Sequence, residues 1–322
     1  MATTTYTPSM LRGAGTRGVP EIPVGSSTSY LLDDYGTNIG AAYSFRKLSS
    51  TYSGNCITLR ENGGGTTAEI GFDGDYIDEA AIIAHCGVNS GYIQKWYDQS
   101  GAFPLTSYGD LENTNTTYQP RIYDGSVVLK KDGLVYADGC RQGLATANRV
   151  GSPPPAEDWL LAGWGFNSQD TATFSVCYQP TAAGPTDYYG NWFGTVKVGA
   201  TLRGCISKEQ GLANTNLDVR PSKETWATPL FTSSMAIPAE QWNLAANIWR
   251  NTPGTTYLNF NGVLGGSTTA YTKLNFREIG MAGAANSACE AWSGEWLLYQ
   301  TPPSAGDIAG IEANIMNYYG IS

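Results

Sequence analysis

The chain has 322 residues, with 28 Asp or Glu, 19 Lys or Arg and one His, which gives a formal net charge of −9 at pH 7. Because binding to nucleic acid requires clustered cations to neutralise phosphates, this acidic chain without a Lys/Arg cluster is not expected to bind nucleic acid. No run of 18 apolar residues occurs, so no membrane-spanning helix and no membrane partner are expected.

The composition favours an all-β fold. Only 15% of the residues are charged, whereas 39 glycines, 16 prolines and 12% aromatic residues suit short strands that are joined by tight turns. Turn residues recur every 8–12 positions, a spacing typical of a sandwich or jelly roll. We therefore predict a single sandwich domain over residues 30–322, preceded by an extended arm over residues 1–29.

The arm is rich in Thr, Gly and Pro, has no apolar periodicity and lacks the apolar segment of a signal peptide. It is either a disordered tail or a docking segment that becomes ordered on a partner. In the second case, the residues expected to contact the partner are Leu11, Arg12, Arg17, Val19 and Ile22.

Two helices are predicted within the β-rich chain. Residues 75–86 begin with an aspartate, stop before Gly87 and place Ile77, Ala80, Ala81 and Ala84 at helical spacing. Residues 304–319 begin with Ser304 as the N-cap residue and end before a glycine, Gly320.

Strands are predicted between these helices. Alternation in 171–180 places Phe174, Val176 and Tyr178 on one face of a strand. In 255–266, an Asn261-Gly262 pair between apolar residues indicates a tight hairpin. A further strand contains Trp292 and Trp296, which simple alternation would place on the same face.

The sequence YIQKWYDQSG (92–101) raises the question of whether Asp98 is catalytic. An aspartate at the end of a strand can accept hydrogen bonds from the backbone two residues further on, and Gly101 can adopt positive φ. We therefore interpret Asp98 as a structural residue of a chain corner.

Metal and cofactor sites are not expected. The six cysteines form no CxxC pair, and the single histidine, His85, falls near the end of a predicted helix, where a cation favours the helix dipole. Free, mostly buried thiols are the expectation for the cysteines. No cofactor is implied by any motif.

The N-terminal half of the predicted domain resembles a known family. AAYSFRKLSSTYSGNC (41–56), DEAAIIAHCG (78–87), KWYDQSG (95–101) and QPRIY (119–123) are similar, in this order, to the catalytic domain of α-L-arabinofuranosidase B. The resemblance covers about residues 41–123 and implies a concanavalin A-like β-sandwich. Similar stretches recur in bacteriophage structural proteins. Residues 242–267 and 294–315 resemble laminin-G-like jelly rolls.

The catalytic carboxylates implied by that resemblance are missing. The nucleophile glutamate of the family aligns with Phe193 in DYYGNWFG, and its acid/base aspartate aligns with Ala284 or Ala285 in EIGMAGAANSA. An apolar side chain cannot act as nucleophile or proton donor. The sequence therefore predicts a non-catalytic protein that keeps the scaffold of a sugar hydrolase.

We expect a bacteriophage virion protein, either a capsid decoration or a tail-fibre component, which is assembled in the host cytoplasm and forms a homo-oligomer with other virion proteins as partners. Binding to a cell-surface glycan is a second expectation, and the candidate residues for it are Asp187, Tyr188, Tyr189, Asn191 and Trp192. The alternative is an active α-L-arabinofuranosidase or another glycoside hydrolase. That alternative requires a carboxyl pair drawn from Asp98, Asp187, Glu290 and Glu295.

Overall fold

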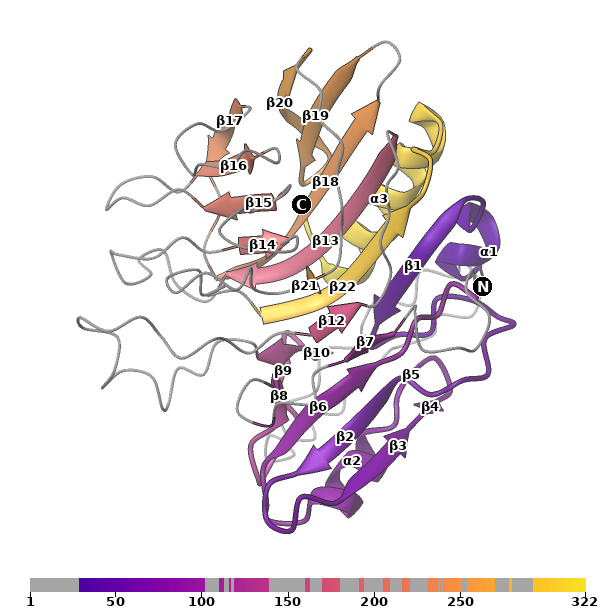
Figure 1. The fold of residues 1–322 in the computed structure, drawn as a ribbon, viewed down its shortest axis with the longest axis vertical. Coiled ribbons are helices and arrows are strands. Elements are labelled where there is room, and N and C mark those ends of the chain that lie inside the picture. Colours follow the sequence, from indigo (N-terminus) through magenta and orange to yellow (C-terminus); the bar gives the residue numbers. More distant parts are fainter. Residues whose placement is uncertain are drawn as a thin grey trace, which may run out of the picture.

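The protein is described by a computed structural model (Figure 1). It describes residues 29–101, 110–112, 116, 119–138, 160–162, 170–179, 191–193, 205–208, 216–220, 231–236, 238, 240–250, 254–269, 278–279 and 292–322. The residues proposed for partner docking, Leu11 to Ile22, lie outside these ranges, so the arm stays a prediction, as does the division into an arm and one domain.

Within the described ranges, strands dominate and three helices occur, which confirms the all-β class. The helices are α1 (Leu31–Tyr35), α2 (Glu79–Cys86) and α3 (Ala305–Tyr319). The strands of a 14-stranded antiparallel sheet are β1 (Ile39–Ser44), β2 (Ile57–Glu61), β3 (Thr67–Ile70), β6 (Gly91–Trp96), β7 (Leu111–Glu112), β8 (Arg121–Tyr123), β11 (Ala137–Asp138), β12 (Leu160–Ala162), β13 (Thr171–Gln179), β18 (Gln241–Arg250), β19 (Thr255–Phe260), β20 (Val263–Thr268), β21 (Glu278–Ile279) and β22 (Trp292–Tyr299).

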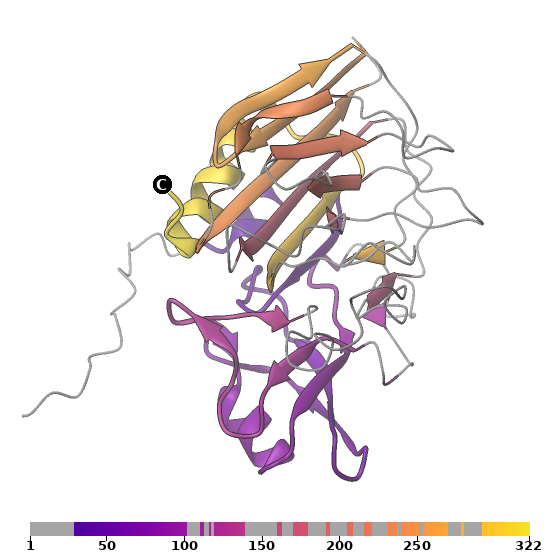
Figure 2. The same cartoon turned by 90° about the vertical axis from the view of Figure 1, so that its left-hand side faces the viewer.

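Three smaller sheets complete the described strands. They are the β4–β5 hairpin (Phe72–Asp73 and Tyr76–Ile77), the β9–β10 hairpin (Lys130–Lys131 and Leu134–Val135), and a four-stranded sheet of β14 (Asn191–Phe193), β15 (Cys205–Lys208), β16 (Asn216–Arg220) and β17 (Phe231–Ala236). The four-stranded sheet contacts the large sheet where β14 meets β13 and where β17 meets β20 (Figures 1 and 2). α3 packs on β18. The large sheet, the four-stranded sheet and α3 together form a layered sandwich.

The last strand, β22, brings the N-terminal and C-terminal parts of the described chain together. β22 pairs with β13 on one side and with β1 on the other, so that Tyr43 lies opposite Trp296. Central strands of the large sheet, such as β1 and β18, are buried on both faces. One face contributes Trp96, Trp249 and Trp296 to a core, and the other contributes Phe174 and Tyr299 to a second core with α3. The predicted alternation of Phe174, Val176 and Tyr178 is confirmed, since all three face α3.

The final helix and the predicted hairpin are confirmed in detail. The Ser304 side chain accepts a hydrogen bond from the backbone N–H of Asp307, and Gly320 adopts the left-handed conformation that ends α3. Asn261 and Gly262, with φ of 48° and 75°, form the turn between β19 and β20. Leu258 on β19 is buried, as the alternation requires.

The prediction of a helix over 75–86 is wrong at its start. Residues 76 and 77 form β5, and the helix begins at Glu79 after Asp78, whose side chain accepts a hydrogen bond from the N–H of Ala81. The buried face is also different from the predicted one, because Ile82 and Cys86 are buried whereas Ala80 and Ala84 are exposed. Ile77 is buried as a strand residue instead.

The expectation that Trp292 and Trp296 share a face is wrong as well. The pairing of β22 with β13 shifts register between Ser293 and Glu295, so Gly294 is an extra residue in a β-bulge. The bulge reverses the alternation. Trp296 therefore enters the first core, and the partly buried Trp292 stacks between Tyr136 and Tyr178 in the second.

Candidate functional site

Two strands, one from each of the segments that align with the catalytic positions of the resembled family, contact each other. Phe193 belongs to β14, where it pairs with Ile206 of β15, and β14 contacts β21. β21 begins the segment EIGMAGAANSA. Ala284 and Ala285 lie outside the described residues. The strand that carries Phe193 and the strand that leads to the second position are thus neighbours.

The predicted glycan-binding residues lie in the same segment as Phe193. Asn191 and Trp192 are strand residues of β14, next to β13 and β21. Asp187, Tyr188 and Tyr189 lie outside the described residues. The structure therefore places part of the predicted glycan-binding segment beside β21, and the role of its side chains stays a prediction.

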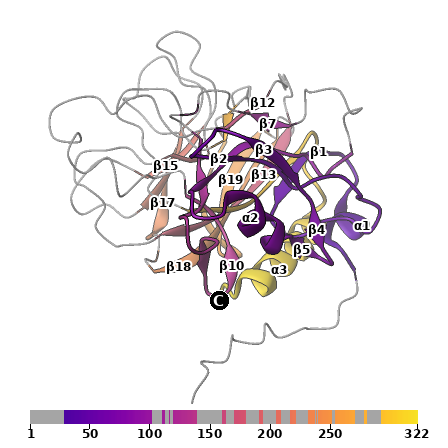
Figure 3. The same ribbon diagram turned by 90° about the horizontal axis from the view of Figure 1, so that it is seen from below.

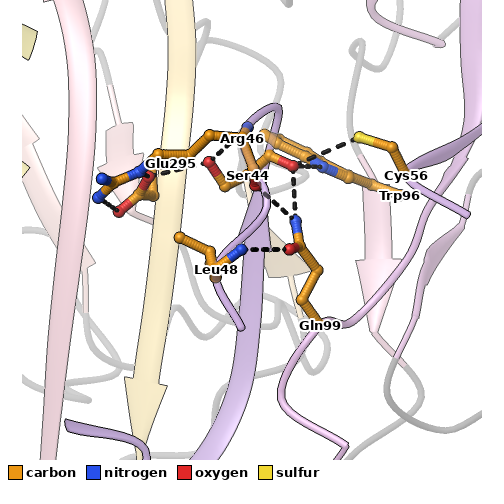
Figure 4. A network of polar contacts seen from close by, with 7 residues as sticks. All are labelled: Ser44, Arg46, Leu48, Cys56, Trp96, Gln99 and Glu295. Carbon is orange, nitrogen blue, oxygen red and sulfur yellow. Dashed lines mark hydrogen bonds and ion pairs between the residues drawn. The ribbon is translucent and has the colours of Figure 1, made fainter. Parts of the chain in front are cut away.

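Glu295, one of the four acids from which the enzymatic alternative would draw its carboxyl pair, is bound by the protein itself. Its side chain is 0% exposed and accepts two hydrogen bonds from Arg46, from Nε at 2.8 Å and from Nη2 at 3.0 Å (Figure 4). The Ser44 hydroxyl donates a third hydrogen bond at 2.9 Å. Burial would lower the pKa of Arg46, but the charge of Glu295 and these hydrogen bonds raise it above its ordinary value.

Arg46 is held on its other side by an aromatic ring. Its guanidinium carbon lies 4.2 Å from the centre of the Tyr318 ring in α3. The ion pair therefore joins β22, the segment after β1 and the end of α3. With both oxygens of Glu295 engaged by the protein, this carboxylate supports the junction and is not available to a substrate.

The corner 98–101 is hydrogen-bonded to the segment that carries Arg46. Gln99, which is buried, accepts a hydrogen bond from Leu48 N–H at 2.9 Å and donates to the carbonyls of Ser44 at 2.8 Å and Arg46 at 3.1 Å. Figure 4 places this side chain beside Ser44, whose carbonyl also accepts weaker contacts from Cys56 and Trp96. One amide thus satisfies three backbone groups of the segment that carries Arg46.

Asp98 makes the structural contacts that the sequence predicts. Its Oδ1 accepts hydrogen bonds from Ser100 N–H at 2.9 Å and from Ala42 N–H of β1 at 2.7 Å, and its Oδ2 accepts one from the Ser100 hydroxyl at 2.6 Å. Gly101 has a φ of 64°. The interpretation of Asp98 as a corner residue is confirmed.

Burial raises the pKa of Asp98 to about 6, although the hydrogen bonds from Ser100 and Ala42 oppose this shift. Asp110 lies close by and accepts a hydrogen bond from the backbone N–H of Asp98 at 3.0 Å. Burial also raises the pKa of Asp110. Because the Asp98 oxygens are engaged by the protein, the two carboxyls do not form an open catalytic pair. Asp187 and Glu290 lie outside the described residues.

A polar hollow of about 420 Å³ lies beside α1, lined by Leu32, Asp33, Asp34, Gly36, Thr37, Ile39, Ser49, Thr51 and Ser100. Asp33 accepts hydrogen bonds from the Ser49 hydroxyl and the Ser50 N–H, both at 3.0 Å. The hydrogen bond from Ser50 lowers the pKa of Asp33, so this carboxyl is ionised and does not serve as a proton donor near neutral pH. The hollow thus offers hydrogen-bonding groups, and Asp33 is already engaged by Ser49 and Ser50.

Thiols and acids of the described ranges form no further site. Cys56 and Cys86 are free and buried, as expected, and Cys177 is buried as well. Burial raises the pKa of the Cys56 thiol, and that of Cys86 to about 11, which keeps both protonated. In these ranges, no three His, Cys, Asp or Glu side chains are grouped to hold a metal ion. Among the helices α1 to α3, none has the length and apolar character needed to cross a membrane.

The Arg46–Glu295 junction is what reasoning from the sequence missed. Arg46 and Gln99 both belong to the motifs of the family resemblance, so the sequence did indicate that these two residues matter. Nothing in the sequence indicated that Glu295 is the partner of Arg46. The two residues are 249 positions apart, and the alternation of side chains along β22 is interrupted at Gly294.

Comparison with known proteins supports the fold. No protein-family model matches the sequence, and no curated protein matches it. Among solved structures, a GH54 α-L-arabinofuranosidase soaked with a cyclic sulfate inhibitor is similar, with a TM-score of 0.55, 14% identity and coverage of 90% of this chain and 64% of that chain. An arabinofuranosidase complexed with arabinofuranosyl-α-1,2-xylobiose has a TM-score of 0.55, 15% identity and coverage of 90% and 65%.

The chain therefore spans about two thirds of the length of these solved proteins. At 14–15% identity the similarity establishes the architecture, which is a β-sandwich like that of these glycoside hydrolases.

Proposed function

We propose that this protein is a non-catalytic member of the sandwich architecture used by arabinofuranosidases, and that it binds glycans as a structural component of a bacteriophage particle. The observation that carries the proposal is that Phe193, which the sequence alignment matches to the nucleophile glutamate of the resembled family, lies on β14 beside β21. Asp98 and Glu295, two of the acids that could substitute for it, are already bound within the protein.

The chemistry of glycoside hydrolysis explains why this substitution matters. A retaining enzyme needs two carboxyl groups about 5–5.5 Å apart, one as nucleophile and one as acid/base. A phenyl ring at the first position cannot form the glycosyl intermediate. It can, however, pack on the apolar face of a sugar ring, so loss of hydrolysis is compatible with retained binding.

The segment proposed to bind glycan contains Asp187, Tyr188, Tyr189, Asn191 and Trp192. Tyr and Trp offer flat surfaces to sugar C–H groups, and Asp and Asn offer hydrogen bonds to hydroxyls. Arabinose-containing oligosaccharides are the first ligands to test, since one of the similar structures holds arabinofuranosyl-α-1,2-xylobiose.

Isothermal titration calorimetry with arabinoxylan oligosaccharides tests this binding. We expect Trp192→Ala to weaken binding about tenfold, a loss of ~1.4 kcal/mol. Val263→Ala, which changes an exposed apolar residue on β20, should bind like the wild type. Equal binding by wild type and Trp192→Ala would contradict the assignment of this segment, and absence of binding by the wild type would contradict the glycan-binding role.

The particle role is supported by the resemblance of residues 41–123 to phage structural proteins. We propose that Leu11, Arg12, Arg17, Val19 and Ile22 contact other virion proteins and that the protein is a homo-oligomer. Light scattering coupled to size-exclusion chromatography should give a multiple of the 34.4 kDa chain mass. A monomer at micromolar concentration would contradict the homo-oligomer, and exclusion of the chain from purified particles would contradict the virion role.

An active α-L-arabinofuranosidase is the second candidate. It is favoured by the structural similarity over 90% of this chain. With Asp98 and Glu295 bound within the protein, this candidate requires the other two of the four candidate acids, Asp187 and Glu290, to supply the catalytic pair. Hydrolysis of an aryl arabinofuranoside that depends on either acid would select it over the non-catalytic proposal.

A further inference from the structure

A second aromatic surface lies far along the chain from residues 187–192, at the β4–β5 hairpin. The turn at Gly74, which has a φ of 62°, connects β4 to β5 and brings Tyr76 to the surface. Tyr76 keeps 44% of its surface exposed to solvent. Figure 3 shows this hairpin near α1 and α3.

The ring of Tyr76 is supported from behind. It stacks with an offset on Tyr318 of α3, with ring centres 6.3 Å apart and planes inclined by 18°. The guanidinium of Arg46 lies 4.2 Å from the centre of the Tyr318 ring, and Arg46 is in turn held by buried Glu295. Tyr76 therefore packs on a ring that also contacts Arg46, a residue fixed by a buried ion pair.

Backbone hydrogen bonds also hold the hairpin against the segment that carries Arg46. The N–H of Lys47 donates to the Asp75 carbonyl at 2.7 Å, and the N–H of Ile77 donates to the Phe45 carbonyl at 2.9 Å. Because the strand and the ring behind it are both fixed, little conformational entropy remains to be lost at Tyr76 when a ligand binds.

Polar residues occupy the neighbouring positions of the hairpin and of the segment hydrogen-bonded to it, since Asp75 precedes Tyr76 and the N–H of Lys47 donates to the Asp75 carbonyl. The Tyr30 hydroxyl donates a 2.5 Å hydrogen bond to Asp75 Oδ1, and the ammonium of Lys47 lies 5.8 Å from the centre of the Tyr30 ring. An acceptor and a donor of opposite charge thus lie on the hairpin and on the segment hydrogen-bonded to it. Sugar hydroxyls both donate and accept hydrogen bonds, so this pair suits a neutral sugar whose C–H face rests on an aromatic ring.

We propose that Tyr76, supported by Tyr318 and flanked by Asp75 and Lys47, is a binding platform for a neutral glycan. This platform is separate from the segment 187–192, and glycan binding at Tyr76 does not depend on glycan binding at that segment. The exposed carboxylates of Asp73 and Asp75 and the negative net charge disfavour an acidic sugar.

The test is calorimetric titration of the full chain with soluble neutral polysaccharides, namely arabinan, arabinoxylan, galactan and β-glucan. We expect at least one of them to bind the wild type, Tyr76→Ala to weaken that binding about tenfold, and Tyr76→Phe to retain most of it, because the ring is kept. Ile83→Ala, which changes an exposed residue on α2, is the matched control and should leave binding unchanged. Circular dichroism of each variant checks that the fold is kept.

The outcomes separate this platform from the proposed function. Loss in Tyr76→Ala with normal binding in Trp192→Ala supports the platform and contradicts the segment 187–192, and the reverse result contradicts the platform. Equal binding by Tyr76→Ala and the wild type overturns the proposal. So does a wild type that binds none of the four polysaccharides, or a Tyr76→Ala variant that alters only the oligomeric mass.

Discussion

Arg46, in the segment after β1, and Glu295, in β22, form a buried two-point ion pair that joins the beginning of the fold to its end. Nε lies 2.8 Å from Oε2 and Nη2 lies 3.0 Å from Oε1, while the Glu295 side chain is 0% exposed. Ser44 and Tyr318 complete its surroundings. A carboxylate on the last strand of a sugar-hydrolase-like sandwich thus has a structural role in this chain.

Glu295→Gln should lower the free energy of unfolding by about 3–5 kcal/mol, because it leaves the buried guanidinium of Arg46 without its counter-charge. Chemical denaturation measures this change. The exposed pair Lys130–Glu79 is the control, and Glu79→Gln should cost less than about 1 kcal/mol. Equal effects of the two substitutions would contradict the structural role of Glu295.

Gln99→Glu should destabilise the corner by about 3 kcal/mol. The substitution replaces an amide nitrogen, which donates to the carbonyls of Ser44 and Arg46, with an oxygen that repels them. Thermal and chemical denaturation should both detect the loss. Gln300→Glu, at an exposed position, should have little effect. A Gln99→Glu variant as stable as the wild type would disprove the bridging role of this side chain.

Asp98 should make stability depend on pH. Its pKa is about 6 in the fold and about 3.9 in an unfolded chain, so its favourable contribution is complete below about pH 4 and is lost as the pH rises through 6. From pH 4 to pH 7.5 the wild type should therefore lose up to about 3 kcal/mol relative to Asp98→Asn. Asn keeps the acceptor for Ala42 and Ser100. Parallel stability curves for the two proteins would refute this prediction.

The bulge at Gly294 should tolerate no side chain. A Cβ there would lie 2.9 Å from Trp242 Cζ3 and 2.9 Å from Tyr319 Cε1, so Gly294→Ala should cost about 1–3 kcal/mol through overpacking. Gly306→Ala is a matched control in α3. Its Cβ would meet nothing closer than Ser304 Oγ at 3.8 Å, and the better helix propensity of Ala should stabilise the protein by up to about 1 kcal/mol. Urea titrations that rank the two variants in the opposite order would contradict this packing.

The features that the sequence predicted correctly are those with local signals. The Asn261-Gly262 turn, the capped helix α3 and the corner at Asp98 each follow from residues within a few positions of one another. The family motifs also indicated the sandwich. In each case the physical cause, a backbone conformation or a hydrogen bond to a near neighbour, lies within the segment itself.

The features that were missed depend on distant contacts. Nothing near Glu295 indicates that Arg46 is its partner, and nothing near Trp292 indicates that Gly294 is a bulge residue, since a bulge is defined by the neighbouring strand β13. The start of α2 was missed for a similar reason. Tyr76 and Ile77 are drawn into a strand by pairing with β4 and by contacts with the segment after β1, which overrides their helical spacing.

The proposal that this sandwich lacks a catalytic carboxyl pair is tested most directly by hydrolysis of 4-nitrophenyl α-L-arabinofuranoside with purified protein. We predict release of nitrophenol no faster than with heat-denatured protein, and no change in Asp187→Asn or Glu290→Gln. Turnover by the folded wild type that either substitution abolishes would contradict the non-catalytic proposal.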